Sequence, residues 1–342
     1  MTLIKSISGI RGTLGGNVGE NLTPIDVVKY AAAYGAWVLS TKKGKKVVVG
    51  RDARISGPMV HELVVNTLIA LGIDVVDAGL STTPTVEMAV VEEKAAGGVI
   101  LTASHNPKQW NALKLLNHKG EFISAADGAM VLELAESNNI AFAGVDQLGS
   151  ITKKDFLPMH IQKILDLPLV KRDIIAAQKF KIAVDAVNSV GGIAVPALLR
   201  ALGVETIEEI NCEPNGHFAH NPEPLPEHLG QIASAVKSAK CDLGIVVDPD
   251  VDRLALICED TEMFGEEYTL VAVADYYLKH TPGPTVSNLS STRALRDITE
   301  KAGQQYEASA VGEVNVVEKM KEIGAVIGGE GNGGIIVPEL HY

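Results

Sequence analysis

Aromatic residues are scarce in this chain, because phenylalanine, tyrosine and tryptophan together make up 4% of its 342 residues. Proteins that bind single-stranded nucleic acid commonly stack bases on such side chains, so few platforms of that kind are available. Basic residues are also outnumbered, since 30 lysines and arginines stand against 42 aspartates and glutamates and leave a net charge of −12. This balance argues against a nucleic-acid partner, and an anionic ligand would need a locally basic pocket.

Cysteine and long apolar runs are limited as well. The three cysteines (Cys212, Cys241 and Cys258) form no Cys-x-x-Cys pair and leave one odd, so no disulfide framework is indicated. No apolar run approaches the roughly 18 residues of a membrane-spanning helix, and the first residues lack the apolar core of a signal peptide. We therefore expect no membrane partner and a cytoplasmic location, with a monomer and a homodimer both left open.

Apolar β-branched runs alternate with helical patterns over nearly the whole length. The apolar run 47–50 precedes a helical pattern over 58–71 and a second apolar run over 73–76. The same order of strand, helix and strand recurs over 181–185, 192–202 and 204–207. The expected fold class is therefore α/β, with tandem α/β domains whose mixed, mostly parallel sheets are covered by helices.

Changes in composition predict where the domains meet. Polar and small residues collect over 137–155, and an acidic stretch lies just before Gly265. We expect three α/β domains and a connecting segment: domain I over 1–150, domain II over 151–264, domain III over 265–342, and a linker over 151–175 that contains a helix at 156–171.

The strongest motif, Asp248-Pro-Asp250-Val-Asp252-Arg253, directly follows the strand-like run 243–247. Alternate residues of a tight loop can bring three carboxylates to one divalent cation, and ligands that are all oxygen favour Mg²⁺, Mn²⁺ or Ca²⁺ over zinc. An EF-hand is rejected, because its sixth position needs glycine and here carries Arg253. A solvated acidic turn is the alternative, although three close carboxylates repel one another unless a cation or a basic group compensates them.

A second motif, Thr102-Ala-Ser104-His105-Asn106-Pro107, ends the apolar run 97–101. A serine in such a loop can accept or donate a phosphoryl group if a metal neutralises the charge. No Gly-x-Ser-x-Gly elbow is present, so a hydrolase triad has no support. A turn before Pro107, in which Ser104 and Asn106 satisfy the backbone, explains the local sequence equally well.

Two further motifs combine glycine with polar residues. Arginines in Ser8-Gly-Ile-Arg11-Gly12 and Gly50-Arg51-Asp52-Ala-Arg54 can present a guanidinium to a phosphate, although ordinary ion pairs are the commoner use. Gly329-Glu330-Gly331-Asn332-Gly333-Gly334 matches Gly-x-Gly-x-x-Gly, but a strand-like run and Pro338 follow instead of a helix, which disfavours a dinucleotide site. A functional interpretation of this loop is that Glu330 and Asn332 bind sugar hydroxyls. A plain hairpin turn is the alternative.

In this order and spacing, the motifs resemble the α-D-phosphohexomutase family, which includes phosphoglucosamine, phosphomannose and phosphoglucose mutases, over all 342 residues. The resemblance implies an isomerase that moves a phosphoryl group between C1 and C6 of a hexose phosphate through a phosphoserine and a bisphosphate intermediate. It implies that Ser104 is the phosphoserine and that its phosphate completes a Mg²⁺ site with Asp248, Asp250 and Asp252.

The resemblance also implies roles for six other residues: Arg11 and His105 as catalytic donors, Lys114 as general acid and base, and Arg253, Glu330 and Asn332 as substrate-binding residues. A solvated lysine is the alternative for Lys114. Two departures leave the hexose open, because Asn111-Ala-Leu113 stands where Asn-Gly is usual before the lysine, and Asn332 and Gly334 stand where many members have serine and histidine.

Members of that family have a fourth, C-terminal domain with an Arg-x-Ser-Gly-Thr phosphate-binding loop, and nothing in this sequence matches it. We expect domain IV to be absent and domain III to be cut short near its end. Phosphoglucosamine mutase is the expected activity. The alternatives are a phosphomannomutase or phosphoglucomutase, and a fragment that binds sugar phosphate but is catalytically impaired.

Overall fold

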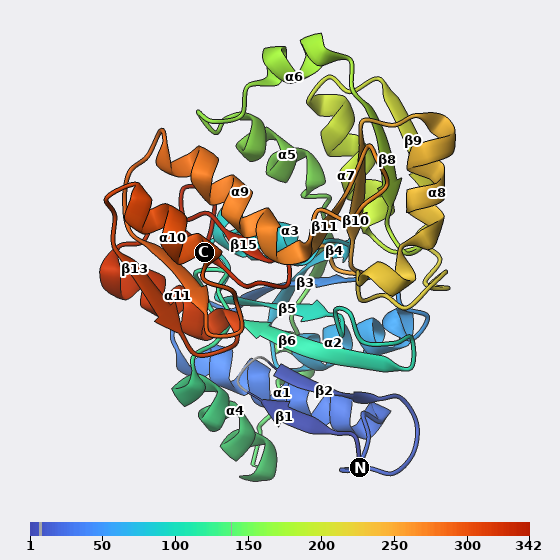
Figure 1. Ribbon diagram of the computed structural model, residues 1–342. Coiled ribbons are helices and arrows are strands. Elements are labelled where there is room, and N and C mark those ends of the chain that lie inside the picture. Colours follow the sequence, from blue (N-terminus) through green and yellow to red (C-terminus); the bar gives the residue numbers. More distant parts are fainter. Residues whose placement is uncertain (7–8, 138) are drawn as a thin grey trace. The chain divides into compact units, whose positions relative to one another are not determined.

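The computed structural model of the chain describes residues 1–6, 9–137 and 139–342, so Ser8 of the first arginine motif lies outside it. The described residues form two compact units. Unit 1 comprises residues 1–158 together with the segment 214–218, and unit 2 comprises 159–213 and 219–342. Unit 1 contains one sheet and unit 2 contains two (Figure 1).

The sheet of unit 1 has the strand order β1-β2-β6-β5-β3-β4-β7. Its strands are β1 (Ile4–Ser6), β2 (Gly9–Thr13), β3 (Lys46–Arg51), β4 (Asp74–Leu80), β5 (Gly97–Leu101), β6 (Trp110–Leu116) and β7 (Ile151–Lys153). β5, β3, β4 and β7 are parallel, whereas β1, β2 and β6 pair in antiparallel fashion. Figure 1 shows β5 and β6 side by side with opposite directions.

Four α-helices cover this sheet: α1 (Pro24–Ser40), α2 (Gly57–Ala70), α3 (Thr83–Glu92) and α4 (Ala125–Ser137). Val47 and Val49 of β3 belong to the core cluster that includes residues of α1, α2 and α4, and α3 contacts β3 and β5. Val47, Val48 and Val49 are all completely buried, as expected for a central strand with both faces covered. The strand, helix and strand predicted over 47–76 are confirmed as β3, α2 and β4.

The first sheet of unit 2 has the order β11-β10-β8-β9, and β11 alone in it is antiparallel. Its strands are β8 (Lys181–Asp185), β9 (Thr206–Ile210), β10 (Leu243–Val247) and β11 (Leu254–Cys258). The helices of this region are α5 (Leu157–Leu165), α6 (Arg172–Gln178), α7 (Gly191–Ala201) and α8 (Gly230–Ala239). β10 and β11 form a hairpin whose loop carries the Asp-Pro-Asp-Val-Asp motif.

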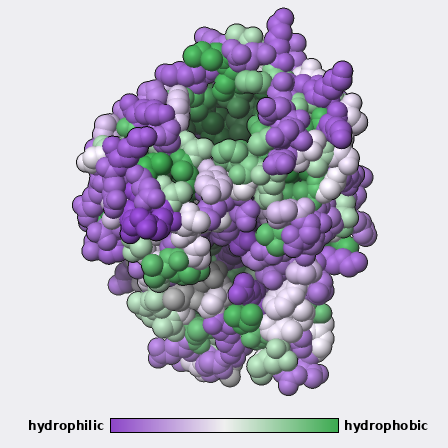
Figure 2. All heavy atoms as spheres, in the orientation of Figure 1, coloured by the Kyte–Doolittle hydropathy of each residue, from purple (hydrophilic) through white to green (hydrophobic). Residues whose placement is uncertain are grey.

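The second sheet of unit 2 has the order β13-β12-β14-β15. Its strands are β12 (Thr285–Asn288), β13 (Tyr306–Ser309), β14 (Ile327–Gly329) and β15 (Ile335–Ile336), and its helices are α9 (Glu266–Leu278), α10 (Ala294–Lys301) and α11 (Glu313–Ile323). The predicted class of mixed, mostly parallel sheets covered by helices is confirmed. Hydrophilic side chains cover most of the face drawn in Figure 2.

Two predicted elements have wrong bounds. The helix expected over 156–171 ends at Leu165, because Pro168 follows in the next turn and disfavours helical backbone before it. The strand expected over 204–207 is β9, which begins at Thr206; the amide of Val204 instead donates to the carbonyl of Leu199 at 2.9 Å and closes α7. The division into domains after residues 150 and 264 stays a prediction. Within the described ranges, no helix combines the length and the apolar character needed to cross a membrane.

Candidate functional site

Ser104 lies in the loop that joins β5 to β6, and its backbone has a φ of +47°. This left-handed region is uncommon for residues other than glycine and costs about 1–3 kcal/mol, so the surrounding structure must hold the residue there. The amide of Ser104 donates to Oγ1 of Thr102 at 2.9 Å, and its Oγ lies 3.3 Å from Nδ1 of His105. The predicted phosphoserine and its neighbour His105 therefore stand on a tightly constrained turn.

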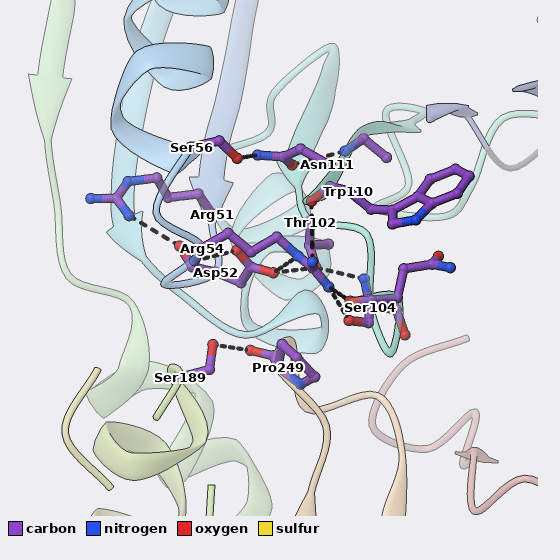
Figure 3. Close-up of polar contacts among 12 residues, drawn as sticks. Arg51, Asp52, Arg54, Ser56, Thr102, Ser104, Trp110, Asn111, Ser189 and Pro249 are labelled. Carbon is purple, nitrogen blue, oxygen red and sulfur yellow. Dashed lines mark hydrogen bonds and ion pairs between the residues drawn. The ribbon is translucent and has the colours of Figure 1, made fainter. Parts of the chain in front are cut away.

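Arg54 lies beneath this loop and is completely buried. Figure 3 shows its guanidinium pointing toward the backbone around Ser104. Its side chain donates to four carbonyl oxygens in the loop and at the start of β6: those of Ser104, of Asn106 at 2.7 Å, of Pro107 at 2.8 Å and of Trp110 at 3.1 Å. Its Nε donates to Asp52 at 2.9 Å. The sequence left two uses open for these arginines, phosphate binding and an ordinary ion pair. Arg54 forms the internal ion pair.

The other predicted cationic residues of unit 1 lie on neighbouring strands. Arg11 on β2 is opposite Ala112 on β6, and Lys114 lies two residues further along β6. Because side chains alternate along a strand, Arg11 and Lys114 share one face of the sheet. Nζ of Lys114 lies 5.7 Å from the ring centroid of Phe122. Nε of Arg11 is buried and has no hydrogen-bond partner within the residues that the structure describes.

The three aspartates of the β10–β11 loop converge, as their alternate spacing predicts. One carboxylate oxygen from each of Asp248, Asp250 and Asp252 lies within 4.8 Å of those from the other two. Asp248 and Asp250 are completely buried, and Val251, between Asp250 and Asp252, adopts a φ of +64°. Such a set of oxygen ligands fits a hard divalent cation, and burying the carboxylates together would be unfavourable without positive charge. These residues could therefore hold a metal ion.

Backbone and side-chain groups fix the shape of this loop. Oδ1 of Asp248 accepts the amides of Asp252 and Arg253, both at 3.2 Å. Oγ of Ser189, which is completely buried, donates to the carbonyl of Pro249 at 2.6 Å (Figure 3). Sequence reasoning missed Ser189; the signal available for it was a polar residue in the turn that follows the predicted strand 181–185.

An ion pair between a buried aspartate and a partly buried histidine lies at the carboxyl end of β8. Oδ2 of Asp185 is 3.2 Å from Nε2 of His220, and Nδ1 of His220 is 2.7 Å from the carbonyl oxygen of Asn221. Both partners are acceptors, so both ring nitrogens act as donors, which is the protonated form. Burial opposes the charge, yet the hydrogen bond and the negative charge of Asp185 outweigh it and raise the pKa of His220.

The glycine-rich loop joins β14 to β15 in an antiparallel hairpin, with Gly329 opposite Ile335, so a strand and not a helix follows it, as the rejection of a dinucleotide site requires. Within it, Nδ2 of Asn332 lies 3.4 Å from Oε2 of Glu330. Oε1 of Glu330 accepts Nδ2 of Asn288 at 2.5 Å and the amide of Gly312 at 3.1 Å. Asn288, at the end of β12, was not predicted, because nothing in its local sequence links it to a loop 42 residues away.

Arg253 follows the aspartate loop directly, and its Nη1 lies 3.4 Å from Oε1 of Glu223. Arg11 and Lys114 thus lie on strands of unit 1, whereas the other predicted site residues lie in loops or directly beside them. The roles assigned to Ser104, Lys114, Arg253 and the other site residues stay predictions.

Comparison with known proteins shows which family this chain is similar to. Models of the family described as phosphoglucomutase/phosphomannomutase match three parts of the chain: alpha/beta/alpha domain I over residues 4–140, domain II over 158–262 and domain III over 265–342.

Individual relatives agree with these matches. A phosphoglucomutase/phosphomannomutase of Thermococcus kodakarensis is 34% identical over 338 residues, which is 96% of this chain and 73% of the relative. A protein named "Probable phosphoglucosamine mutase" of Methanopyrus kandleri is 32% identical, over 98% of this chain and 71% of the relative. A crystal structure of a phosphoglucomutase/phosphomannomutase family protein from Burkholderia thailandensis has a TM-score of 0.83 at 25% identity, covering 99% of this chain and 74% of that one.

Proposed function

The chain belongs to the phosphoglucomutase/phosphomannomutase family, and on this premise we propose that it interconverts 1- and 6-phosphates of a hexose through a phosphoserine at Ser104. Its relatives are mutases, so it is an intramolecular phosphotransferase of the isomerase class. The observation that carries the proposal is the conformation of Ser104, whose left-handed backbone is held by a buried arginine instead of relaxing. A serine kept in a strained conformation is typical of a residue that does chemistry.

Each phosphoryl transfer exchanges one bond between phosphorus and oxygen for another. The bond between phosphorus and Oγ of phosphorylated Ser104 breaks while a sugar hydroxyl forms a new bond to the same phosphorus. The proton of that hydroxyl passes to a base, for which we propose Lys114, and from there to Oγ of Ser104, which leaves as a hydroxyl. The resulting hexose bisphosphate reorients, its other phosphoryl group moves to Oγ of Ser104, and the proton of the serine hydroxyl returns to the sugar oxygen that is released.

We assign the carboxylates of Asp248, Asp250 and Asp252, together with the phosphate on Ser104, to a Mg²⁺ site. The support for this assignment is a cluster of three carboxylates, two of them completely buried, that offers only oxygen ligands. Such a cation, when bound, supplies charge neutralisation for a transferring phosphoryl group. Asp248 also holds the loop in one shape, through the two amides that its carboxylate accepts.

The remaining residues would bind and orient the sugar phosphate. We propose Arg11 and His105 as donors near the transferring group and Arg253 as a substrate-binding cation. Glu330 would accept hydrogen bonds from sugar hydroxyls, and Asn332 would donate to them. The carboxylate of Glu330 is already oriented by its hydrogen bond from Asn288. For the hexose, we propose glucosamine phosphate first, with mannose or glucose phosphate as the alternative, since relatives at similar identity carry each of these names.

Two measurements test the proposal. Incubation with glucose 1,6-bisphosphate and a magnesium salt, followed by intact-mass analysis, should show one added phosphoryl group that Ser104→Ala abolishes and Ser291→Ala retains. Coupled mutase assays on glucosamine, mannose and glucose phosphates then identify the hexose. A chain that binds sugar phosphate but never becomes phosphorylated would contradict the proposal and favour the impaired, binding-only alternative.

A further inference from the structure

The guanidinium of Arg54 uses all of its hydrogen-bond donors inside the protein. An arginine side chain has five N–H groups. Those of Arg54 have five acceptors: Oδ2 of Asp52 for Nε, the carbonyls of Pro107 and Trp110 for Nη1, and the carbonyls of Asn106 and Ser104 for Nη2. Since the side chain is also completely buried, no donor remains for a phosphate, and the residue must act through the loop it holds.

Asp52 reaches the same serine from its other side. Its Oδ2 accepts Oγ1 of Thr102 at 2.7 Å, and that oxygen in turn accepts the amide of Ser104 at 2.9 Å. The carbonyl of Ser104 is held by Arg54, which is paired with Asp52. Both peptide groups of Ser104 are therefore connected to one buried ion pair, directly on one side and through Thr102 on the other.

We propose that Arg54 and Asp52 are positioning residues for phosphoryl transfer, because they impose the left-handed conformation that aims Ser104. This inference rests on the proposed function of Ser104. The conformation costs about 1–3 kcal/mol and would relax if its supports were removed. A displacement of about 1 Å in a reacting group can lower a rate about 100-fold, so losing the guanidinium should slow the transfer without removing any group that touches substrate.

The segment 214–218 covers the ion pair within unit 1. The ring centroid of Phe218 lies 5.1 Å from Cζ of Arg54, in the arrangement of a cation–π contact. Gly216 has a φ of +75°, and a Cβ placed there would lie 2.0 Å from the carbonyl oxygen of Ala53. Backbone therefore packs directly against the turn that carries Asp52 and Arg54, which keeps the guanidinium dry and its hydrogen bonds strong.

The test compares variants of the full chain that disturb the support in different ways. Arg54→Lys keeps the positive charge but offers three donors from one point, so it cannot bridge the four carbonyls. Thr102→Val removes only the relay to the amide of Ser104 and keeps the shape of the side chain. Tyr34→Phe is the matched control, because Oη of Tyr34 donates to two buried carbonyls on β5 and β6, away from the loop.

We expect Arg54→Lys to lower kcat on the order of 100-fold with KM nearly unchanged, and Thr102→Val to lower it less. Tyr34→Phe should lose stability yet keep the wild-type kcat. Arg54→Ala should regain part of its rate when methylguanidinium is added, provided that this variant folds. Equal losses of kcat in Tyr34→Phe and Arg54→Lys at equal loss of stability would overturn the inference.

Hydrogen exchange without substrate separates this inference from the proposed function. The amides of Ser104 and Asn106, both hydrogen-bonded inside the loop, should exchange faster in Arg54→Lys and Thr102→Val than in the wild type, and not in Tyr34→Phe. Unchanged exchange at these amides would overturn the inference even in an active enzyme. A wild-type chain that is never phosphorylated, with exchange as expected, would refute the function of Ser104 and leave the support of the loop established.

Discussion

Arg54 and Asp52 form a completely buried ion pair, with Nε of the guanidinium 2.9 Å from Oδ2 of the carboxylate. Burying two charges is unfavourable unless their remaining donors and acceptors are satisfied. Here the arginine donors that do not bind Asp52 are satisfied by backbone carbonyls of the loop that carries Ser104. The same hydrogen bonds therefore stabilise the buried ion pair and fix the shape of the candidate catalytic loop.

Removing the charge of Asp52 should destabilise unit 1. Asp52→Asn leaves a buried guanidinium without its counter-charge, and breaking a buried pair in this way costs about 3–5 kcal/mol. Urea unfolding should show a loss of this size. Asp275→Asn, which breaks an exposed pair with Lys279, should cost less than about 1 kcal/mol. Comparable small effects of both changes would mean that the buried pair does not hold the turn.

Neutralising one aspartate of the β10–β11 loop should weaken metal binding. Asp250→Asn keeps the size of the side chain but removes one of three converging charges, so the affinity for Mn²⁺ or Mg²⁺ should fall about 100-fold or more. Titration calorimetry measures it, and Glu259→Gln, an exposed acid beyond the loop, is the control with unchanged affinity. An affinity that survives Asp250→Asn would place the cation elsewhere.

The hydroxyl of Ser189 should support the same site without touching the ion. Ser189→Ala removes the donor to the carbonyl of Pro249, and loss of such an outer support typically lowers metal affinity about 10-fold. Ser234→Ala removes a hydroxyl that donates to the carbonyl of Gly230 from an exposed position on α8. Binding of Mn²⁺ followed by electron paramagnetic resonance should separate the two variants, and identical affinities would rule out this role for Ser189.

His160 should make the protein less stable in mild acid. Burial, followed by the positive charges of His341 and Lys163, lowers the pKa of this histidine to about 4. The unfolded chain binds the proton near pH 6.5, so stability should fall as the pH drops from about 6.5 to about 4 and level off below. A pKa difference of this size corresponds to about 3 kcal/mol.

Thermal unfolding as a function of pH measures this loss. His160→Asn should flatten the curve between those pH values, whereas His280→Asn, at an exposed position, should leave its slope unchanged. A curve with the same slope in His160→Asn and the wild type would show that His160 is not the group responsible.

A side chain at position 216 should disturb the cover of the ion pair. Gly216→Ala places a Cβ 2.0 Å from the carbonyl oxygen of Ala53 at a positive φ, so the segment 214–218 must shift. We expect a lower unfolding temperature and faster hydrogen exchange near Arg54. Gly230→Ala, where a Cβ meets nothing within 4 Å, is the control. Equal unfolding temperatures in the two variants would contradict the packing described for this segment.

Local sequence was sufficient for most of the elements. The β-branched run 47–50 and the helical period after it predicted β3 and α2, because hydrophobic periodicity is a property of neighbouring residues. The errors arose at element ends. α5 stops at Leu165 before a proline, and β9 starts only at Thr206, where pairing with Lys181 on β8 decides the register. Strand pairing depends on a partner far along the chain, which periodicity does not report.

The candidate site divides in the same way. By itself the sequence determined the serine loop, the three aspartates and the glycine-rich hairpin, because each is a short motif whose residue types carry the chemistry. Only the tertiary structure decided what holds Ser104. The acceptors for Arg54 are backbone carbonyls at least 50 residues away, and every residue has such a carbonyl. A group common to all residues leaves no signal in the sequence, so folding alone selects which of them a buried arginine will bind.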